Sequence, residues 1–188
     1  MLLPLTPSQT AGPFLSIGLL RAPMLAELVP AGTLGAIRVH GSVFDGAGEP
    51  VTDALVELWQ ADPAGRYPAG AAGAGAAGAG GFSGFGRSGT AAGGRFDFLT
   101  VKPGRVAGPA GMLQAPHLSV GIFARGLLRR LATRLYFPDE EAANAEDPLL
   151  SGLAPAARAT LVAEPAGEGS IRLDIRLQGP GQTTFFAL

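Results

Sequence analysis

Residues 55–67 constrain the possible folds of this chain more than any other stretch. Their sequence, LVELWQADPAGRY, opens with an alternating run that is typical of a half-buried strand, spanning residues 53–60. Leu55, Glu57 and Trp59 would face one way, and Ala54, Val56 and Leu58 the other. A turn follows, because Pro63 restricts φ and Gly65 can relax a strained corner. Arg66 and Tyr67 therefore lie just past the strand end, where proteins often build a site.

Strand signals recur along the rest of the chain and outnumber helix signals. Besides residues 53–60, alternating or β-rich runs occupy 35–44, 94–101, 116–124, 131–137, 160–164, 170–178 and 183–186. One short helix suits 138–149, because Pro138 opens it and acidic residues follow. Seven or eight short strands with one or two short helices and long loops predict an all-β fold, namely a two-sheet β-sandwich.

A chain of 188 residues is long enough for one domain with a sizeable core, so we expect residues 1–188 to form a single domain. Residues 1–34 are predicted to be an N-terminal arm and loop. Within them, 5–20 has too many turn formers for a regular element and should pack against the rest of the protein. Residues 68–81, almost pure Gly and Ala, are predicted to be an inserted flexible loop.

Charge and cysteine content exclude several classes of function. Fourteen basic residues oppose fifteen acidic ones, so no basic field attracts nucleic acid. Zero cysteines exclude disulfides and thiolate metal sites. No export signal and no apolar run of membrane-spanning length is evident, so we expect a cytoplasmic protein that does not enter a membrane. Only 15% of residues are charged, which reflects either a surface covered by other subunits or simply an Ala-rich composition.

The pattern WQAxxxGRY, which ends at Tyr67, resembles the signature of the intradiol ring-cleavage dioxygenases. Other segments that resemble this family flank it from Thr6 to Leu188, so the resemblance covers nearly the whole chain. It implies a β-sandwich and a ferric ion held by two tyrosines and two histidines, a donor set of the kind that ferric iron favours. In such enzymes the metal binds a catechol, and O2 then cleaves the ring between the two hydroxyl-bearing carbons.

Only part of that ligand set is present in this chain. Tyr67 matches the first tyrosine, but the second tyrosine of the family follows a Pro-Gly turn, and here Pro103-Gly104 runs into Arg105, Val106 and Ala107. We therefore predict that this ligand is missing.

The family's His-x-His pair is also incomplete. Its positions are occupied by His117 and Ser119, and the arginine that precedes the pair is Gln114 here. The other histidine, His40, is most simply a hydrogen-bonded strand residue, and Tyr136 a core residue. Tyr67, His117 and Ser119 are thus degenerate ligand positions, and we predict no catalytic residue, no metal site and no cofactor in this chain.

This pattern of losses is similar to one branch of the family, in which an iron-binding β subunit pairs with a homologous α subunit that lacks the full ligand set. The segments TPSQTAGP at 6–13, FARG at 123–126 and QGPGQTTFF at 178–186 resemble that α subunit, although Phe14 stands where a tyrosine is common. The resemblance implies that Fe(III) is bound by a homologous β partner.

By the same resemblance, Thr10, Gly12 and Pro13 would reach over the partner's cavity, and Arg125 would bind the substrate. A guanidinium suits the carboxylate of 3,4-dihydroxybenzoate, which it can bind as a fork. The simpler interpretations remain open: Arg125 as an exposed turn residue, and Gly12 with Pro13 as a turn that anchors the arm. The expected small-molecule partners are an aromatic ortho-diphenol and O2.

Two other classes of function remain open. The chain could be a homomeric dioxygenase that completes an atypical iron site with Ser119, water or His40. It could instead be a non-enzymatic β-sandwich binding module of transthyretin-like build. The absence of an export signal and the intact block from Trp59 to Tyr67 argue against the second alternative.

Overall fold

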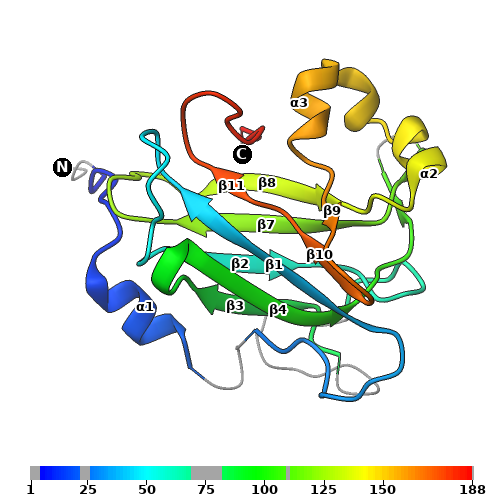
Figure 1. The fold of residues 1–188 in the computed structure, drawn as a ribbon, viewed down its shortest axis with the longest axis horizontal. Coiled ribbons are helices and arrows are strands. Elements are labelled where there is room, and N and C mark those ends of the chain that lie inside the picture. The colour runs from blue at the N-terminus through cyan, green and yellow to red at the C-terminus, as the bar shows by residue number, and fades with distance from the viewer. Residues whose placement is uncertain (1–4, 22–25, 69–81, 109–110, 188) are drawn as a thin grey trace.

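The computed structural model describes residues 5–21, 26–68, 82–108 and 111–187. Two sheets lie face to face as the layers of a sandwich (Figure 1), which confirms the predicted all-β architecture. Within the described residues, no helix is both long and apolar enough to span a bilayer.

The first sheet is organised around its longest strand, β1 (Ala36–Phe44). β1 pairs antiparallel with β4 (Arg95–Val101) on one edge and parallel with β10 (Ser170–Arg172) and β11 (Ile175–Arg176) on the other. β9 (Glu164–Pro165) extends this sheet beside β10.

The second sheet has the strand order β3-β2-β7-β8, and every pair in it is antiparallel. Its strands are β3 (Phe85–Gly89), β2 (Leu55–Trp59), β7 (His117–Phe123) and β8 (Leu131–Tyr136). A short ribbon of β5 (Val106–Ala107) and β6 (Leu113–Gln114) leads into β7.

Alternating side chains of the two sheets build the main core between them. On the inner face of the second sheet, Val56, Leu58, Leu118 and Ile122 are fully buried. They belong to one cluster with residues of the first sheet such as Phe98. Each such side chain stabilises the fold by about 1.5–3 kcal/mol relative to its exposed state. The alternation predicted for residues 54–59 is thereby confirmed.

A smaller core lies on the outer face of the second sheet, where the last part of the chain covers it. It contains Ala115, Tyr136, Ala143, Leu150 and Leu161. The covering elements are α2 (Glu141–Glu146), the 3-10 turn η3 (Leu150–Gly152) and α3 (Pro155–Ala159). Figure 1 shows these helices grouped at one end of the sandwich.

Asp147 ties this covering segment to the sheet. Its carboxylate accepts the backbone N–H of Ala115 at 2.8 Å and those of Leu149 and Leu150 at 2.9 and 3.0 Å. It also accepts the hydroxyl of Tyr136 at 3.3 Å. A fully buried carboxylate is tolerated here because four donors replace its water shell. Asp147 therefore links the residues just before β7 both to β8 and to the covering segment.

Several sequence-based predictions need correction. Residues 5–20 were expected to hold no regular element, but α1 (Pro13–Leu19) forms there, because Pro13 at its first position already has a helical φ. β3 was missed, since FGRSG carries little strand propensity and forms only by pairing with β2. Of the strands predicted at 160–164 and 183–186, only Glu164 is in one, although Phe186 makes an isolated bridge to Ala132.

The predicted Gly/Ala loop at 68–81 lies outside the described residues, except for Pro68. The division of the chain into a single domain with an N-terminal arm stays a prediction.

Gly41 in β1 provides a test of the packing between β1 and the chain after β10. A Cβ on Gly41 would lie 1.9 Å from the carbonyl oxygen of Leu173 and 2.9 Å from Cζ of Phe96. Gly41→Ala should lower the free energy of unfolding by about 2–3 kcal/mol, because the backbone must move apart. Urea denaturation measures this, with Gly152→Ala as the control, since nothing lies within 4 Å of its added Cβ. Equal urea midpoints for both variants would contradict this packing.

Candidate functional site

One row of side chains crosses the outer face of the second sheet. Trp59 in β2 lies opposite Ser119 in β7, and Ser119 lies opposite Arg134 in β8. Two residues further along, on the same face, His117 in β7 lies opposite Tyr136 in β8. Directly opposed residues of paired strands point to the same face, so these five side chains share one surface.

Tyr67 reaches this surface from the turn after β2. The carboxylate of Asp62 accepts the backbone N–H groups of Ala64 and Arg66, both at 2.9 Å, which closes the turn. The ring of Tyr67 then stacks on Trp59, with centroids 5.8 Å apart and planes 9° apart. Burial raises the pKa of the Tyr67 phenol, and the positive charge of Arg134 lowers it in part. The phenol is therefore protonated at neutral pH and 43% of the residue remains exposed.

His117 is held in one orientation at the start of β7. Its Nδ1 lies 2.8 Å from the carbonyl oxygen of Ala115, which can only accept, so Nδ1 carries the proton and Nε2 keeps its lone pair. Burial and, to a smaller extent, the positive charge of Arg134 together lower the pKa of His117 to about 4. The imidazole is therefore neutral at pH 7.

Arg134 contributes a fixed positive charge to the same face. Its Nη1 donates to Oε1 of Gln114 at 2.7 Å and to the hydroxyl of Tyr136 at 3.2 Å. Burial raises the pKa of Tyr136 to about 12, against the opposing effect of Arg134, so this partner is a neutral phenol. Among the described residues, no carboxylate forms an ion pair with Arg134.

These residues do not fit a ferric ion. Tyr67 and His117 are ordinary iron ligands on this face, but the hydroxyl of Tyr136 is buried and bonded to Arg134 and Asp147. Ser119 is a weak ligand, and the Arg134 guanidinium repels a cation. No tyrosine follows the turn at Gly104, where Arg105 instead donates to Glu146 and to the carbonyl of Leu113. In the described part of the chain, no group of three His, Asp or Glu residues could hold a metal.

The remaining candidate ligands are Tyr136 and His40. Tyr136 is fully buried in the smaller core, which confirms its interpretation as a core residue. His40 lies in β1, in the other sheet, as predicted. Its ring makes no hydrogen bond to any described residue, and its hydrogen bond stays a prediction.

The residues predicted to contact substrate lie at the opposite end of β7. Thr10 accepts the backbone N–H of Gly126 through its hydroxyl at 2.8 Å, which brings the N-terminal arm beside Arg125. The side chain of Arg125 is 75% exposed and forms an ion pair with Asp53. Gly12 accepts the N–H of Leu15, and Pro13 begins α1. Thr10, Gly12 and Arg125 therefore gather in one region, roughly 20 Å along the strand from His117.

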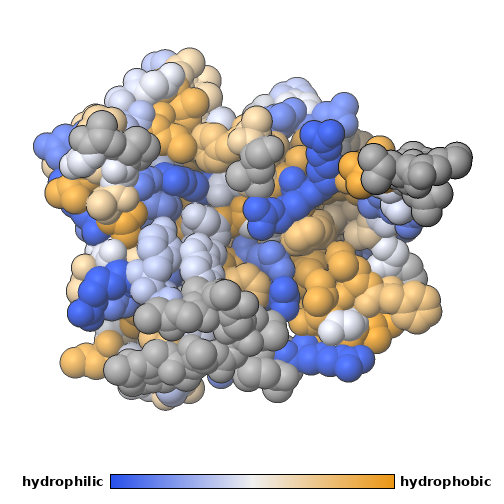
Figure 2. Space-filling view, turned by 180° about the vertical axis from the view of Figure 1, so that it is seen from behind, coloured by the Kyte–Doolittle hydropathy of each residue, from blue (hydrophilic) through white to orange (hydrophobic). Residues whose placement is uncertain are grey.

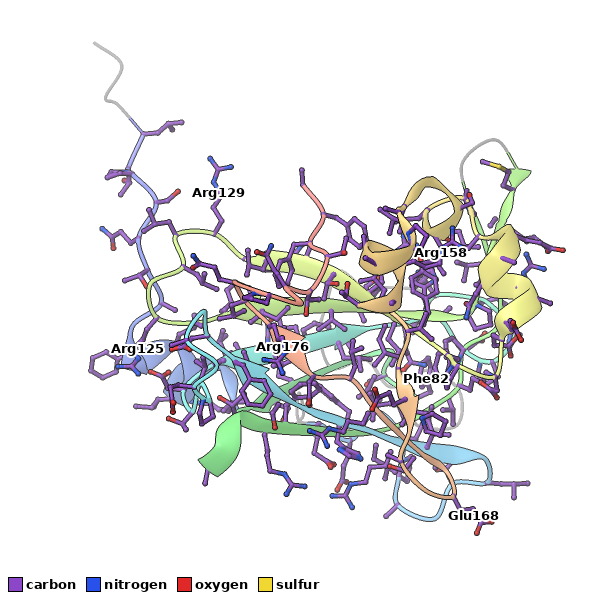
Figure 3. All side chains as sticks on the ribbon, turned by 45° about the horizontal axis from the view of Figure 1, so that its top comes forward. Phe82, Arg125, Arg129, Arg158, Glu168 and Arg176 are labelled. Atoms are coloured by element: carbon purple, nitrogen blue, oxygen red, sulfur yellow. The ribbon has the colours of Figure 1, made fainter. Side chains whose placement is uncertain are left out.

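A groove of about 380 Å³ lies between the arm and the loop joining β7 to β8. It is lined by Thr10, Gly12, Phe14, Leu128, Arg129 and Arg130, among others. Phe14, Ile17 and Leu128 of this region are 80%, 61% and 60% exposed. Hydrophobic side chains gather over this end of the molecule (Figure 2). Figure 3 shows Arg125 on the side of the arm and Arg129 projecting away from the β7–β8 loop.

Sequence reasoning identified Tyr67, His117 and Ser119 but missed Arg134. Arg134 lies two residues before Tyr136 in the same predicted strand, so the alternation places both on one face. Its relation to His117 and Ser119 depends on the pairing of β7 with β8. A hairpin prediction for residues 116–137 that also specified the strand register would have placed Arg134 opposite Ser119.

The buried His117 should make stability depend on acidity. The unfolded state takes up a proton near pH 6.5 but the folded state only near pH 4, so the free energy of unfolding falls as pH drops through this window. The loss amounts to about 2–4 kcal/mol. In His117→Gln, urea denaturation at pH 6.5 and near pH 4 should show a correspondingly smaller loss. The control is His40→Gln; an unchanged loss in His117→Gln would contradict a buried neutral imidazole.

Comparisons with known proteins agree with this geometry. The sequence profile of the dioxygenase family matches residues 22–179. The protocatechuate 3,4-dioxygenase alpha chain of Burkholderia cepacia is 42% identical over 196 residues, covering 96% of each chain. The beta chain of the same organism's protocatechuate 3,4-dioxygenase is 40% identical over 130 residues, covering 67% of this chain and 54% of that one.

A solved dioxygenase structure has the same fold as this chain. The dioxygenase domain of a carbohydrate-binding fusion protein from Streptomyces sp. SirexAA-E is 28% identical, with a TM-score of 0.60, covering 93% of this chain and 99% of that chain. The extent of these matches, together with the face that carries Tyr67 and His117, shows that this chain belongs to the intradiol ring-cleavage dioxygenase family.

Proposed function

We propose that this chain is the α subunit of a protocatechuate 3,4-dioxygenase and that it works with a homologous, iron-binding β subunit. The assembly would add both atoms of O2 to 3,4-dihydroxybenzoate, cleaving the bond between the hydroxyl-bearing carbons to give 3-carboxy-cis,cis-muconate. One observation carries the proposal: a chain similar to α chains over nearly its whole length has Arg134, rather than a further ligand, on the face of Tyr67 and His117.

The donor set explains why a partner is required. Tyr67 and Nε2 of His117 supply two ligands, and Arg134 raises the electrostatic cost of any cation beside them. The iron must then be held by another chain. The similarity of this chain to a β chain supports a partner of the same fold, and the absence of cysteine agrees with a cytoplasmic location for the assembly.

The arm side of the molecule is the part that we propose contributes to the partner's substrate pocket. Arg125 is exposed, and its ion pair with Asp53 holds the guanidinium without enclosing it. The hydrogen bond from Gly126 to Thr10 keeps the arm against this loop. Gly12 presents bare backbone, with nothing within 4 Å of the position that a Cβ would take. Pro13 fixes the direction in which the chain leaves toward α1.

The exposed apolar residues beside this region support the same assignment. Phe14, Ile17 and Leu128 leave large hydrophobic surface in water, which monomeric proteins rarely gather in one place. Covering them with a partner would stabilise the assembly, and it would bring Arg125 and Thr10 to the edge of the shared surface.

Co-expression tests the assignment directly. The isolated chain should be colourless after purification with ferric iron, since a tyrosinate-to-iron charge-transfer band requires bound iron. Co-expressed with a β chain from a related two-subunit enzyme, it should purify as a coloured complex that consumes O2 with 3,4-dihydroxybenzoate. Iron content and oxygen uptake are measured for each chain alone and for both together. Colour, stoichiometric iron and turnover in this chain alone would contradict the proposal.

The role of Arg125 can be separated from general assembly. In the complex, Arg125→Ala should raise KM for 3,4-dihydroxybenzoate by about tenfold or more, since a charge-assisted bond to the carboxylate is lost. KM for catechol, which has no carboxylate, should change little. The matched control is Arg129→Ala, which removes an exposed arginine from the same loop. Equal increases in KM for both substrates would count against a role in carboxylate binding.

A further inference from the structure

The outer face of the second sheet presents four polar groups whose hydrogen-bonding capacity is not filled by any described residue. They are the hydroxyls of Tyr67 and Ser119, Nε2 of His117, and the remaining N–H groups of Arg134. Ser119 lies between Trp59 and Arg134 in the strand register, and the Tyr67 ring lies against Trp59. Donors, an acceptor and an aromatic wall therefore lie together on one face of the sheet.

The charge balance of this face favours an anion. Arg134 is half-buried, and its two acceptors, Gln114 and Tyr136, are both neutral. The nearest carboxylate in its network, Asp147, reaches it only through the Tyr136 hydroxyl and already accepts three backbone N–H groups. A partly desolvated guanidinium without an anionic partner gains most from a carboxylate that it can bind as a fork.

We propose that this face of the chain is itself a binding site for an aromatic carboxylate of the hydroxybenzoate class. The carboxylate accepts hydrogen bonds from Arg134 and Ser119, and the ring lies beside the stacked pair of Tyr67 and Trp59. A ring hydroxyl donates to Nε2 of His117. The interaction is non-covalent and involves no metal.

Each part of the site matches one part of such a ligand. The neutral imidazole of His117, oriented by the carbonyl of Ala115, is a good acceptor for a phenol. Tyr67 is rigid enough to serve as a wall, because Trp59 supports it, yet 43% of the residue is open to solvent. Arg134 is held by Gln114 and Tyr136, so little side-chain entropy is lost on binding.

This inference does not rest on the proposed contribution of Arg125 to a partner's pocket. Arg125 follows the far end of β7 from His117 and belongs to the groove beside the arm. Binding at Arg134 is measured on this chain alone, whereas the role of Arg125 is measured by turnover of a complex. Failure of one therefore leaves the other standing.

Titration of the purified full-length chain with 4-hydroxybenzoate tests the proposal. Isothermal calorimetry should show saturable binding, and the emission of Trp59 should change with the same dissociation constant. Since Trp59 is the only tryptophan in the chain, this signal reports the location of the ligand. Arg134→Met should weaken binding by about tenfold or more, because a hydrogen-bonded charge is removed. Arg95→Met, the matched control, removes an exposed arginine from β4 in the other sheet and should bind like the wild type.

Two control ligands, each lacking one feature of 4-hydroxybenzoate, test which parts of the ligand are recognised. Acetate should bind about tenfold more weakly or worse, since it has no ring to contact Tyr67. 4-Hydroxybenzyl alcohol should also bind about tenfold more weakly or worse, since it has no charge to pair with Arg134. If Arg134→Met fails to fold by circular dichroism, Ser119→Ile replaces it, because its β-branched side chain suits a strand and fills the space before Arg134. Absence of saturable binding, equal binding by acetate, or wild-type affinity in the folded variant would overturn the proposal.

Discussion

The pairing of β7 with β2 on one side and β8 on the other determines both the core and the site. Leu118, Val120 and Ile122 of β7 face the first sheet, and the residues between them face outward. Because side chains alternate, a slip of one residue would expose the core and bury the site. The buried carboxylate of Asp147, which accepts the N–H of Ala115, fixes where β7 begins. Stability and function therefore depend on the same register.

On this framework the positively charged side chain of Arg134 shares one face with Tyr67 and His117. Burial and the charge of Arg134 keep His117 neutral, and the same charge disfavours a metal ion on this face and favours an anion. We therefore propose two separable roles for this fold: the surface at the arm end of β7 contacts a partner, and the face at the other end binds a carboxylate. Because ring cleavage in this family requires iron, we propose that the chemistry belongs to the partner.

Features set by contiguous residues could be predicted from the sequence, whereas features that depend on the pairing of strands were missed. The strand ending at Trp59, the position of Tyr67 and the loss of one histidine at Ser119 follow from contiguous residues. The gathering of Thr10 with Arg125 was expected from family resemblance, and the hydrogen bond to Gly126 accounts for it. Arg134 was missed because its importance lies in register, and β3 because FGRSG forms a strand only beside β2. In α1, the turn-forming Pro13 begins a helix instead of preventing one.

The central claim is that this chain cannot hold the iron used by its own assembly. Anomalous diffraction at the iron absorption edge, from crystals of the chain bound to its β partner, tests it most directly. The account predicts that each iron peak is ligated only by residues of the partner and that the face carrying Tyr67, His117 and Arg134 has none. An iron peak bonded to Tyr67, His117 and further donors of this chain would contradict it.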